Sequence, residues 1–198
     1  MIIKSIKETS YNGMFRVEPE EGSIFYIRKE YLNENLFNKI AIHVAFDDDD
    51  TNLILDAGLC CAVELKAISY LARAEQNRVS LTRKLIAKKY DRKYIEIALS
   101  YLEKKEYLSD LRFSTAWLNT RCLNHYEGRT KLLAELLSRG ISYDIANIAL
   151  DKFFTENDEE KIFQLAYEKL SKKKSGEKLN AALIQAGFTY KQIRQFRQ

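Results

Sequence analysis

Proline is almost absent from this chain of 198 residues, in which Pro19 is the single example. A proline inside a helix removes a backbone hydrogen bond and clashes with the preceding turn, so its absence permits uninterrupted helices from residue 60 to the end. Runs of 18 apolar residues are also missing, and no signal peptide is recognisable behind Met1. We therefore expect a cytoplasmic protein with no membrane span and no membrane partner.

Residues that carry catalytic chemistry are equally scarce. The seven glycines are scattered and form no phosphate-binding loop. The two histidines are His43 and His125, and neither belongs to a Ser-His-Asp or Cys-His arrangement. His43 lies in an apolar alternation, which favours a structural role. We therefore predict no catalytic residues, no cofactor and no enzymatic activity.

Metal-binding patterns are missing too. The acidic run Asp47–Asp50 lacks the alternating ligands, the glycine and the late glutamate of a calcium loop, so we interpret it as a solvated turn that caps a helix beginning near Asn52. Cys60, Cys61 and Cys122 are odd in number and show no metal-ligand spacing, which is typical of a reducing compartment. The adjacent pair is expected to serve as small apolar residues of a helix.

Charge is unevenly distributed along the chain, although the net charge is only +4. Residues 1–65 contain 6 Lys and Arg against 12 Asp and Glu, a net of −6, whereas residues 66–198 contain 26 against 16, a net of +10. A basic segment of this size suits a polyanion or an acidic protein surface. The alternative is a lysine-rich face that only contacts solvent.

A helix ending recurs three times in the second two-thirds of the chain. The three windows are residues 85–90, 136–141 and 183–188, which lie 51 and then 47 residues apart. A capping residue follows each window: Asp91, Ser142 and Thr189. A period of this size indicates a stacked-repeat protein, which builds an extended surface for a macromolecular partner rather than one catalytic pocket.

The turn residue of each window carries a further prediction. Gly140 and Gly187 stand one residue past their helices, where a left-handed backbone favours glycine. Lys89 holds that place in the first window, so either Lys89 adopts a positive φ or that helix ends differently.

The predicted fold is mainly α, with three tandem three-helix repeat units, elongated and curved, preceded by a small N-terminal β-meander. Alternating residues on both sides of the Asn12–Gly13 turn predict the strands. The expected divisions are an acidic extension over 1–50 and repeats over 51–110, 111–157 and 158–198.

The run from Glu106 to Trp117, EYLSDLRFSTAW, resembles a motif of the RecX family, regulators of the recombinase RecA. That motif reads approximately Gly-Tyr-Leu-Asp-Asp-x-Arg-Phe-Ala; this chain departs from it at Glu106, Ser109 and Ser114. The resemblance implies a partner, the filament of RecA on single-stranded DNA, and a regulator that lodges in the filament groove. It further implies that the protein inhibits filament growth, recombination, ATP turnover and co-protease activity during DNA repair and the SOS response.

The same residues also have structural interpretations. Asp110 is a strong N-cap for the helix that follows. Phe113 and Trp117 are four residues apart and share one helix face, where they would hold the first repeat against the second. Arg112 is placed to pair with Asp110 or with a neighbouring repeat.

Cations recur at corresponding positions of the three predicted repeats, and stacking of the repeats would align them in a stripe that follows a phosphate backbone or an acidic groove. We predict that these residues bind the partner: Arg83, Lys84, Lys88, Arg129, Lys131, Arg139, Lys172, Lys173, Lys174 and Lys178. Single-stranded DNA is a second candidate partner, and we expect a monomer. The alternative function is a helical module that binds nucleic acid directly, without a recombinase.

Overall fold

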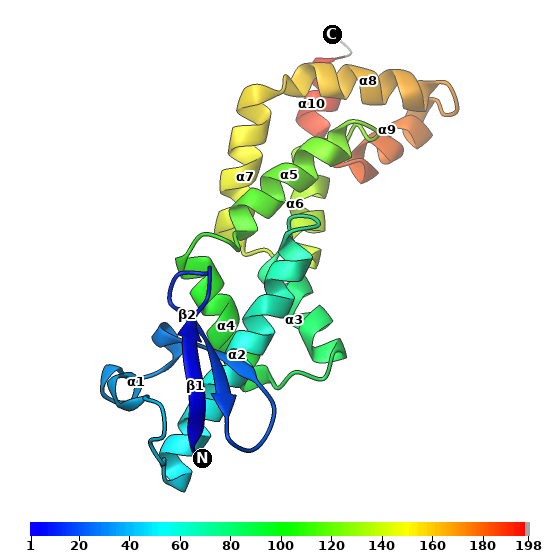
Figure 1. Cartoon of the computed structure of the whole chain (residues 1–198). Coiled ribbons are helices and arrows are strands. Elements are labelled where there is room, and N and C mark those ends of the chain that lie inside the picture. Colours follow the sequence, from blue (N-terminus) through cyan, green and yellow to red (C-terminus); the bar gives the residue numbers. More distant parts are fainter. Residues whose placement is uncertain (197–198) are drawn as a thin grey trace. The chain divides into compact units, whose positions relative to one another are not determined.

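The computed structural model describes residues 1–196, which form two compact units (Figure 1). One unit combines residues 1–74 with 81–108, and the other combines residues 75–80 with the chain from 109 onward. A mainly helical fold behind a small antiparallel sheet is confirmed. The bounds of the three predicted repeats stay a prediction, and residues 197 and 198 of the last one lie outside the described chain.

The N-terminal sheet is a three-stranded antiparallel meander of β1 (Ile3–Glu8), β2 (Met14–Pro19) and β3 (Phe25–Arg28). Gly13 turns the chain between the first two strands with a φ of 71°, as the Asn-Gly pair predicts. A 3-10 turn and the short helix α1 (Glu34–Lys39) lead to α2.

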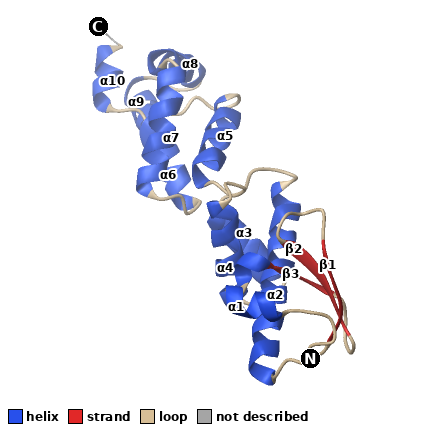
Figure 2. Ribbon diagram, turned by 60° about the vertical axis from the view of Figure 1, so that its left-hand side comes forward, coloured by secondary structure: helices blue, strands red, loops and turns tan. Residues whose placement is uncertain are grey.

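Helix α2 (Asp48–Leu71) packs against the sheet (Figure 2). Asp47 caps it by accepting a hydrogen bond from the backbone N–H of Asp50 at 2.8 Å, which confirms the capping role of the acidic run, although the helix begins four residues before Asn52. Cys60 and Cys61 are buried in α2, as predicted. Gly58 lets β3 approach closely, because a Cβ there would stand 2.8 Å from a ring carbon of Phe25.

A buried ion pair ties the sheet to α2. Arg28, at the end of β3, donates to both carboxylate oxygens of Glu64 at 2.8 and 2.5 Å. The hydroxyl of Tyr31 donates to the same carboxylate at 2.8 Å. Only 5% of Arg28 and 1% of Glu64 is exposed, so each charge depends on the other for its stabilisation.

Two further helices, α3 (Arg78–Ala87) and α4 (Arg92–Lys104), complete the α2–α4 group. Its core contains Val63, Leu81, Leu85, Ile95 and Leu99, all fully buried. Lys89 has a φ of 66°, so the first of the two alternatives for the α3–α4 turn is confirmed. Glu106, which replaces the glycine of the resembled motif, also has a positive φ, 59°.

The second unit holds two further groups of helices. The first is α5 (Asp110–Cys122), α6 (Arg129–Ser138) and α7 (Tyr143–Glu156), and the second is α8 (Glu159–Ser171), α9 (Gly176–Gln185) and α10 (Tyr190–Gln195). Each group has its own apolar core, centred on Leu118, Leu136 and Leu150 in one and on Phe163 and Leu183 in the other. The predicted capping box at Thr189 is present.

The structure corrects the role predicted for Asp110. Ser109 caps α5, since its hydroxyl accepts from the backbone N–H of Arg112 at 3.2 Å. The carboxylate of Asp110 instead accepts from the backbone N–H of Arg78, at the start of α3, at 2.8 Å. The Arg112 side chain pairs with Glu75.

Structural roles were also predicted for Phe113, Trp117 and His43. Phe113 and Trp117 pack on the α5–α7 core, from the same face of α5. His43 does not pack as a structural side chain: 73% of it is exposed, and its contribution is a backbone hydrogen bond to the carbonyl of Ile3 at 2.8 Å.

Residues 75–80, which belong to the second unit, closely approach the α6–α7 turn of that unit. Asn77, directly before α3, is fully buried and donates from Nδ2 to the carbonyl of Arg139 at 3.4 Å. Gly140 follows Arg139 in the α6–α7 turn with a φ of 85°, and a Cβ there would stand 2.6 Å from Val79. The start of α3 therefore receives the turn that follows α6.

The same arrangement recurs one group later. The backbone N–H of Gly128, directly before α6, donates to the carbonyl of Ala186 at 2.8 Å. Gly187 follows in the α9–α10 turn with a φ of 95°, and a Cβ there would stand 2.6 Å from both the Cβ and the backbone nitrogen of Lys131. The start of α6 thus receives the turn that follows α9.

Candidate partner-binding surface

The cations of α3 are exposed, as predicted for partner-binding residues. Helix α3 buries Leu81 and Leu85, whereas Arg83 and Lys84 are exposed on it, and Lys88 is exposed directly after its last residue. Helical geometry accounts for Arg83, which is two residues from both Leu81 and Leu85 and therefore lies opposite the buried stripe.

An aromatic ring of α2 lies beside one of these cations. The ammonium nitrogen of Lys84 is 5.5 Å from the centre of the Tyr70 ring, and that of Lys66 is 5.3 Å from the same centre. Cations at this distance are attracted to the ring face. Sequence reasoning missed Lys66 and Tyr70, although their spacing of four residues on a helix was a usable signal.

The predicted cations of α6 are engaged within the chain. Arg129 pairs with Asp151 at 2.5 Å. Arg139 pairs with Glu135 at 2.6 Å, and its guanidinium carbon is 4.5 Å from the centre of the Trp117 ring. These contacts hold α6 against α7 and α5, so a partner would compete with existing interactions.

Lys131 belongs to a half-enclosed cluster around Glu127. Only 7% of Glu127 is exposed. Its carboxylate accepts hydrogen bonds from Arg121 at 2.8 and 3.0 Å and pairs with the Lys131 ammonium at 2.9 Å. Burial alone raises the pKa of Glu127, but the hydrogen bonds from Arg121 and Lys131 outweigh it and lower that pKa to about 2. The carboxylate therefore stays ionised, and Lys131 is held in a structural role.

The cations at the α8–α9 connection are exposed. Lys172, Lys173 and Lys174 follow the end of α8, and Lys178 lies in the first half of α9. Positive charge at the C-terminal end of a helix is favoured by the helix dipole, which accounts for part of this cluster without any partner. The exposure of four consecutive or neighbouring lysines leaves them accessible to an anionic surface.

The ten predicted residues are thus divided. Those of α3 belong to the first unit and the other seven to the second. The exposed members lie on or directly after α3 in the first unit and at the α8–α9 connection in the second, whereas those of α6 are paired. Alignment of all ten in one stripe stays a prediction.

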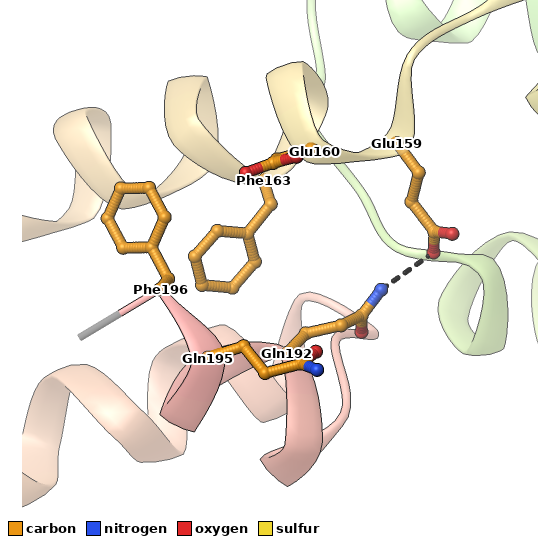
Figure 3. A pocket seen from close by; sticks show the side chains of 6 residues that line it. All are labelled: Glu159, Glu160, Phe163, Gln192, Gln195 and Phe196. Atoms are coloured by element: carbon orange, nitrogen blue, oxygen red, sulfur yellow. Dashed lines mark hydrogen bonds between the residues drawn. The ribbon is translucent and has the colours of Figure 1, made fainter. Parts of the chain in front are cut away.

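A crevice lies between α8 and α10, and none of its described lining residues is a cation (Figure 3). Glu159, Glu160, Phe163, Gln192 and Phe196 line it together with Gln195. The amide of Gln192 donates to Glu159 at 2.8 Å, and the rings of Phe163 and Phe196 meet at 5.0 Å between centres. These contacts dock α10 on α8, and the carboxylates make the crevice unsuitable for a phosphate.

Residues 1–196 contain neither a candidate metal site nor a candidate membrane-spanning helix. No three His, Cys, Asp or Glu side chains are placed to hold a metal ion. No helix in the same residues is both long and apolar enough to cross a membrane.

Comparison with known proteins supplies relatives in sequence and in fold. No family model matches the chain. The regulatory protein RecX of Treponema pallidum (strain Nichols) is 33% identical over 129 residues, which cover 65% of this chain and 79% of that protein. The regulatory protein RecX of Herbaspirillum seropedicae is 28% identical over 139 residues, covering 68% and 88% of the two chains.

Solved structures agree with these relatives. A crystal structure of regulatory protein RecX superposes with a TM-score of 0.78 at 15% identity and covers 99% of this chain and 98% of its own. RecX from Lactobacillus salivarius gives a TM-score of 0.61 at 21% identity, covering 69% and 93%. At these identities the structures establish the fold, and the sequence relatives establish descent. This chain therefore belongs to the RecX family of regulatory proteins.

Proposed function

We propose that this protein binds the filament of RecA on single-stranded DNA and inhibits its growth, and with it recombination, ATP hydrolysis and co-protease activity. Membership of the RecX family and the motif at residues 106–117 support this partner. The protein regulates without catalysis, so inhibition arises because it binds one state of the filament more tightly than the others.

The observation that carries the proposal is the exposure of lysines and arginines on α3 and at the α8–α9 connection. A recombinase filament presents nucleic-acid phosphates and protein carboxylates, both of which attract such cations. The paired cations of α6 contribute less, because each must leave a carboxylate before it binds another.

Cosedimentation with preformed RecA filaments on single-stranded DNA tests the partner. The same DNA without RecA is the control, and ATP hydrolysis by the filament is followed in parallel. We expect retention by the filament, weak retention by bare DNA and slower hydrolysis. Equal retention by both, with unchanged hydrolysis, contradicts a recombinase partner.

Charge reversal tests the surface. We expect the triple variant Lys172→Glu, Lys173→Glu and Lys174→Glu to weaken filament binding and to flatten its salt dependence. Each lost phosphate contact reduces the logarithmic salt slope by about 0.7 to 0.9. The triple variant Lys7→Glu, Lys161→Glu and Lys191→Glu changes the net charge equally at exposed positions outside the predicted surface and controls for bulk charge. Equal losses in both variants would mean that net charge, rather than this cluster, governs binding.

One observation favours the second candidate, direct binding of nucleic acid. The Tyr70 ring, with Lys66 and Lys84 beside it, combines an aromatic face with two ammonium groups. Single-strand-binding proteins use that combination to hold a base and its phosphates. Tight, salt-dependent binding to bare DNA that Tyr70→Ala abolishes would support this function.

A further inference from the structure

A groove runs between α5 and α7, which lie side by side in the second unit (Figure 1). Ser109, Leu111, Arg112 and Thr115 line it from the α5 side, and Ile148 and Lys152 line it from α7. The groove lies on the surface of the α5–α7 group, and its lining includes none of the ten cations predicted from the sequence.

Two of the lining residues are large, apolar and exposed. Leu111 is 39% exposed and Ile148 is 55% exposed. The core of this group is already filled by other residues of the two helices, among them Leu118, Ala146 and Leu150. Leu111 and Ile148 are therefore not required for that core, and they flank a place where an incoming apolar side chain would lose contact with water.

The charged residues of the groove are both cationic. Arg112 is paired with Glu75, whereas the ammonium of Lys152, 61% exposed, lies 3.9 Å from Glu156, at the outer limit of an ion pair. No carboxylate is among the lining residues of the described chain. The exposed ammonium of Lys152 thus favours a carboxylate on the occupant and opposes a cation.

We propose that this groove receives an acidic segment of the recombinase filament that inserts one large apolar side chain between Leu111 and Ile148 and places a carboxylate near Lys152. This inference rests on the proposed function and names a protein contact within it. A DNA strand suits the groove less well, because its two flanking side chains are aliphatic and offer no flat ring on which a base stacks.

Truncation of the apolar pair is the main test, with cosedimentation on RecA filaments as the measurement. We expect Leu111→Ala with Ile148→Ala to weaken binding about tenfold or more, since two contact residues of an interface centre are lost. The matched control is Leu137→Ala with Ile97→Ala, which removes side chains that are 40% and 42% exposed on α6 and α4. We expect the control to bind within about twofold of the wild type.

Lys152 supplies a second test that does not disturb packing. Lys152→Glu is expected to weaken filament binding, and Lys152→Arg is expected to retain it. If the Leu111 and Ile148 variant fails to fold, as judged by circular dichroism, this pair of variants decides the question.

The outcomes separate the two proposals. Failure of the wild-type protein to bind filaments overturns the proposed function. Wild-type binding with full retention in the groove variants overturns the groove as a contact. A parallel loss of binding to bare single-stranded DNA would make nucleic acid the occupant and would overturn the acidic protein segment.

Discussion

Replacement of Gly187 by alanine tests the contact between the α9–α10 turn and the start of α6. The φ of 95° is unfavourable for any residue with a Cβ, at a cost of about 1–2 kcal/mol. The added Cβ would also stand 2.6 Å from the Cβ and backbone nitrogen of Lys131 and 2.8 Å from the carbonyl oxygen of Gly128. These neighbours are held by the helix, so overpacking adds about 1–3 kcal/mol. We expect a total loss of about 2–5 kcal/mol in the free energy of unfolding.

Gly176 provides the matched control for this prediction. Its φ is also positive, 55°, but nothing lies within 4 Å of a Cβ built there. Gly176→Ala therefore meets only the backbone cost, partly offset by the lower entropy of the unfolded chain, and is expected to lose about 1 kcal/mol or less. Urea denaturation followed by the fluorescence of the single tryptophan, Trp117, measures both variants. Equal losses in the two would refute the close approach as the reason for glycine at 187.

Other predictions concern buried charges and thiols. Glu64→Gln leaves the Arg28 charge buried without its partner and should lower the free energy of unfolding by about 3–5 kcal/mol in urea denaturation, whereas replacing both residues by methionine should recover most of the loss. The folded pKa of Glu127, about 2, is below its usual 4.5, so its stabilisation is complete above pH 4.5 and is lost as the pH falls toward 2. Thermal unfolding of Glu127→Gln should therefore lack up to about 3 kcal/mol of this pH dependence. Burial raises the pKa of Cys60 to about 11, so a thiol reagent at pH 8 should label the half-buried Cys122 first, as peptide mass analysis would show.

Local chemistry explains why the helices could be predicted from the sequence. Asp91, Ser142 and Thr189 each cap the helix expected of them, because capping depends on a side chain and a backbone N–H two or three residues away. The left-handed turns at Gly140 and Gly187 are equally local, since they follow from the end of one helix.

Contacts between helices explain why the candidate site could not be predicted to the same extent. The helical period places Arg129 on the surface of α6, but it does not show that Asp151 of α7 approaches it. Glu127 and Glu135 stand four residues before Lys131 and Arg139, so for these two pairs the spacing was a usable signal.

The prediction that Asp110 caps α5 was wrong for a related reason. Ser109 and Asp110 are both good capping residues, and the outcome depends on the start of α3, 32 residues earlier, which takes the carboxylate of Asp110. A pattern confined to one helix contains no information on that neighbour.

The glycines of the helix turns reflect packing as well as backbone conformation. Gly140 and Gly187 have positive φ, but so does Lys89 at the equivalent place, so conformation alone does not require glycine. The three turns differ in their neighbours. A Cβ at Gly140 would stand 2.6 Å from Val79 and a Cβ at Gly187 would stand 2.6 Å from Lys131, whereas Lys89 is exposed. The turn at 140 contacts the start of α3, and the turn at 187 contacts the start of α6. The α3–α4 turn belongs to the first three-helix group, so residues 1–196 contain no earlier group with a helix start for it to contact. A lysine is therefore tolerated there at the cost of backbone strain, and it adds a cation beside Lys88 on the surface proposed to meet the filament.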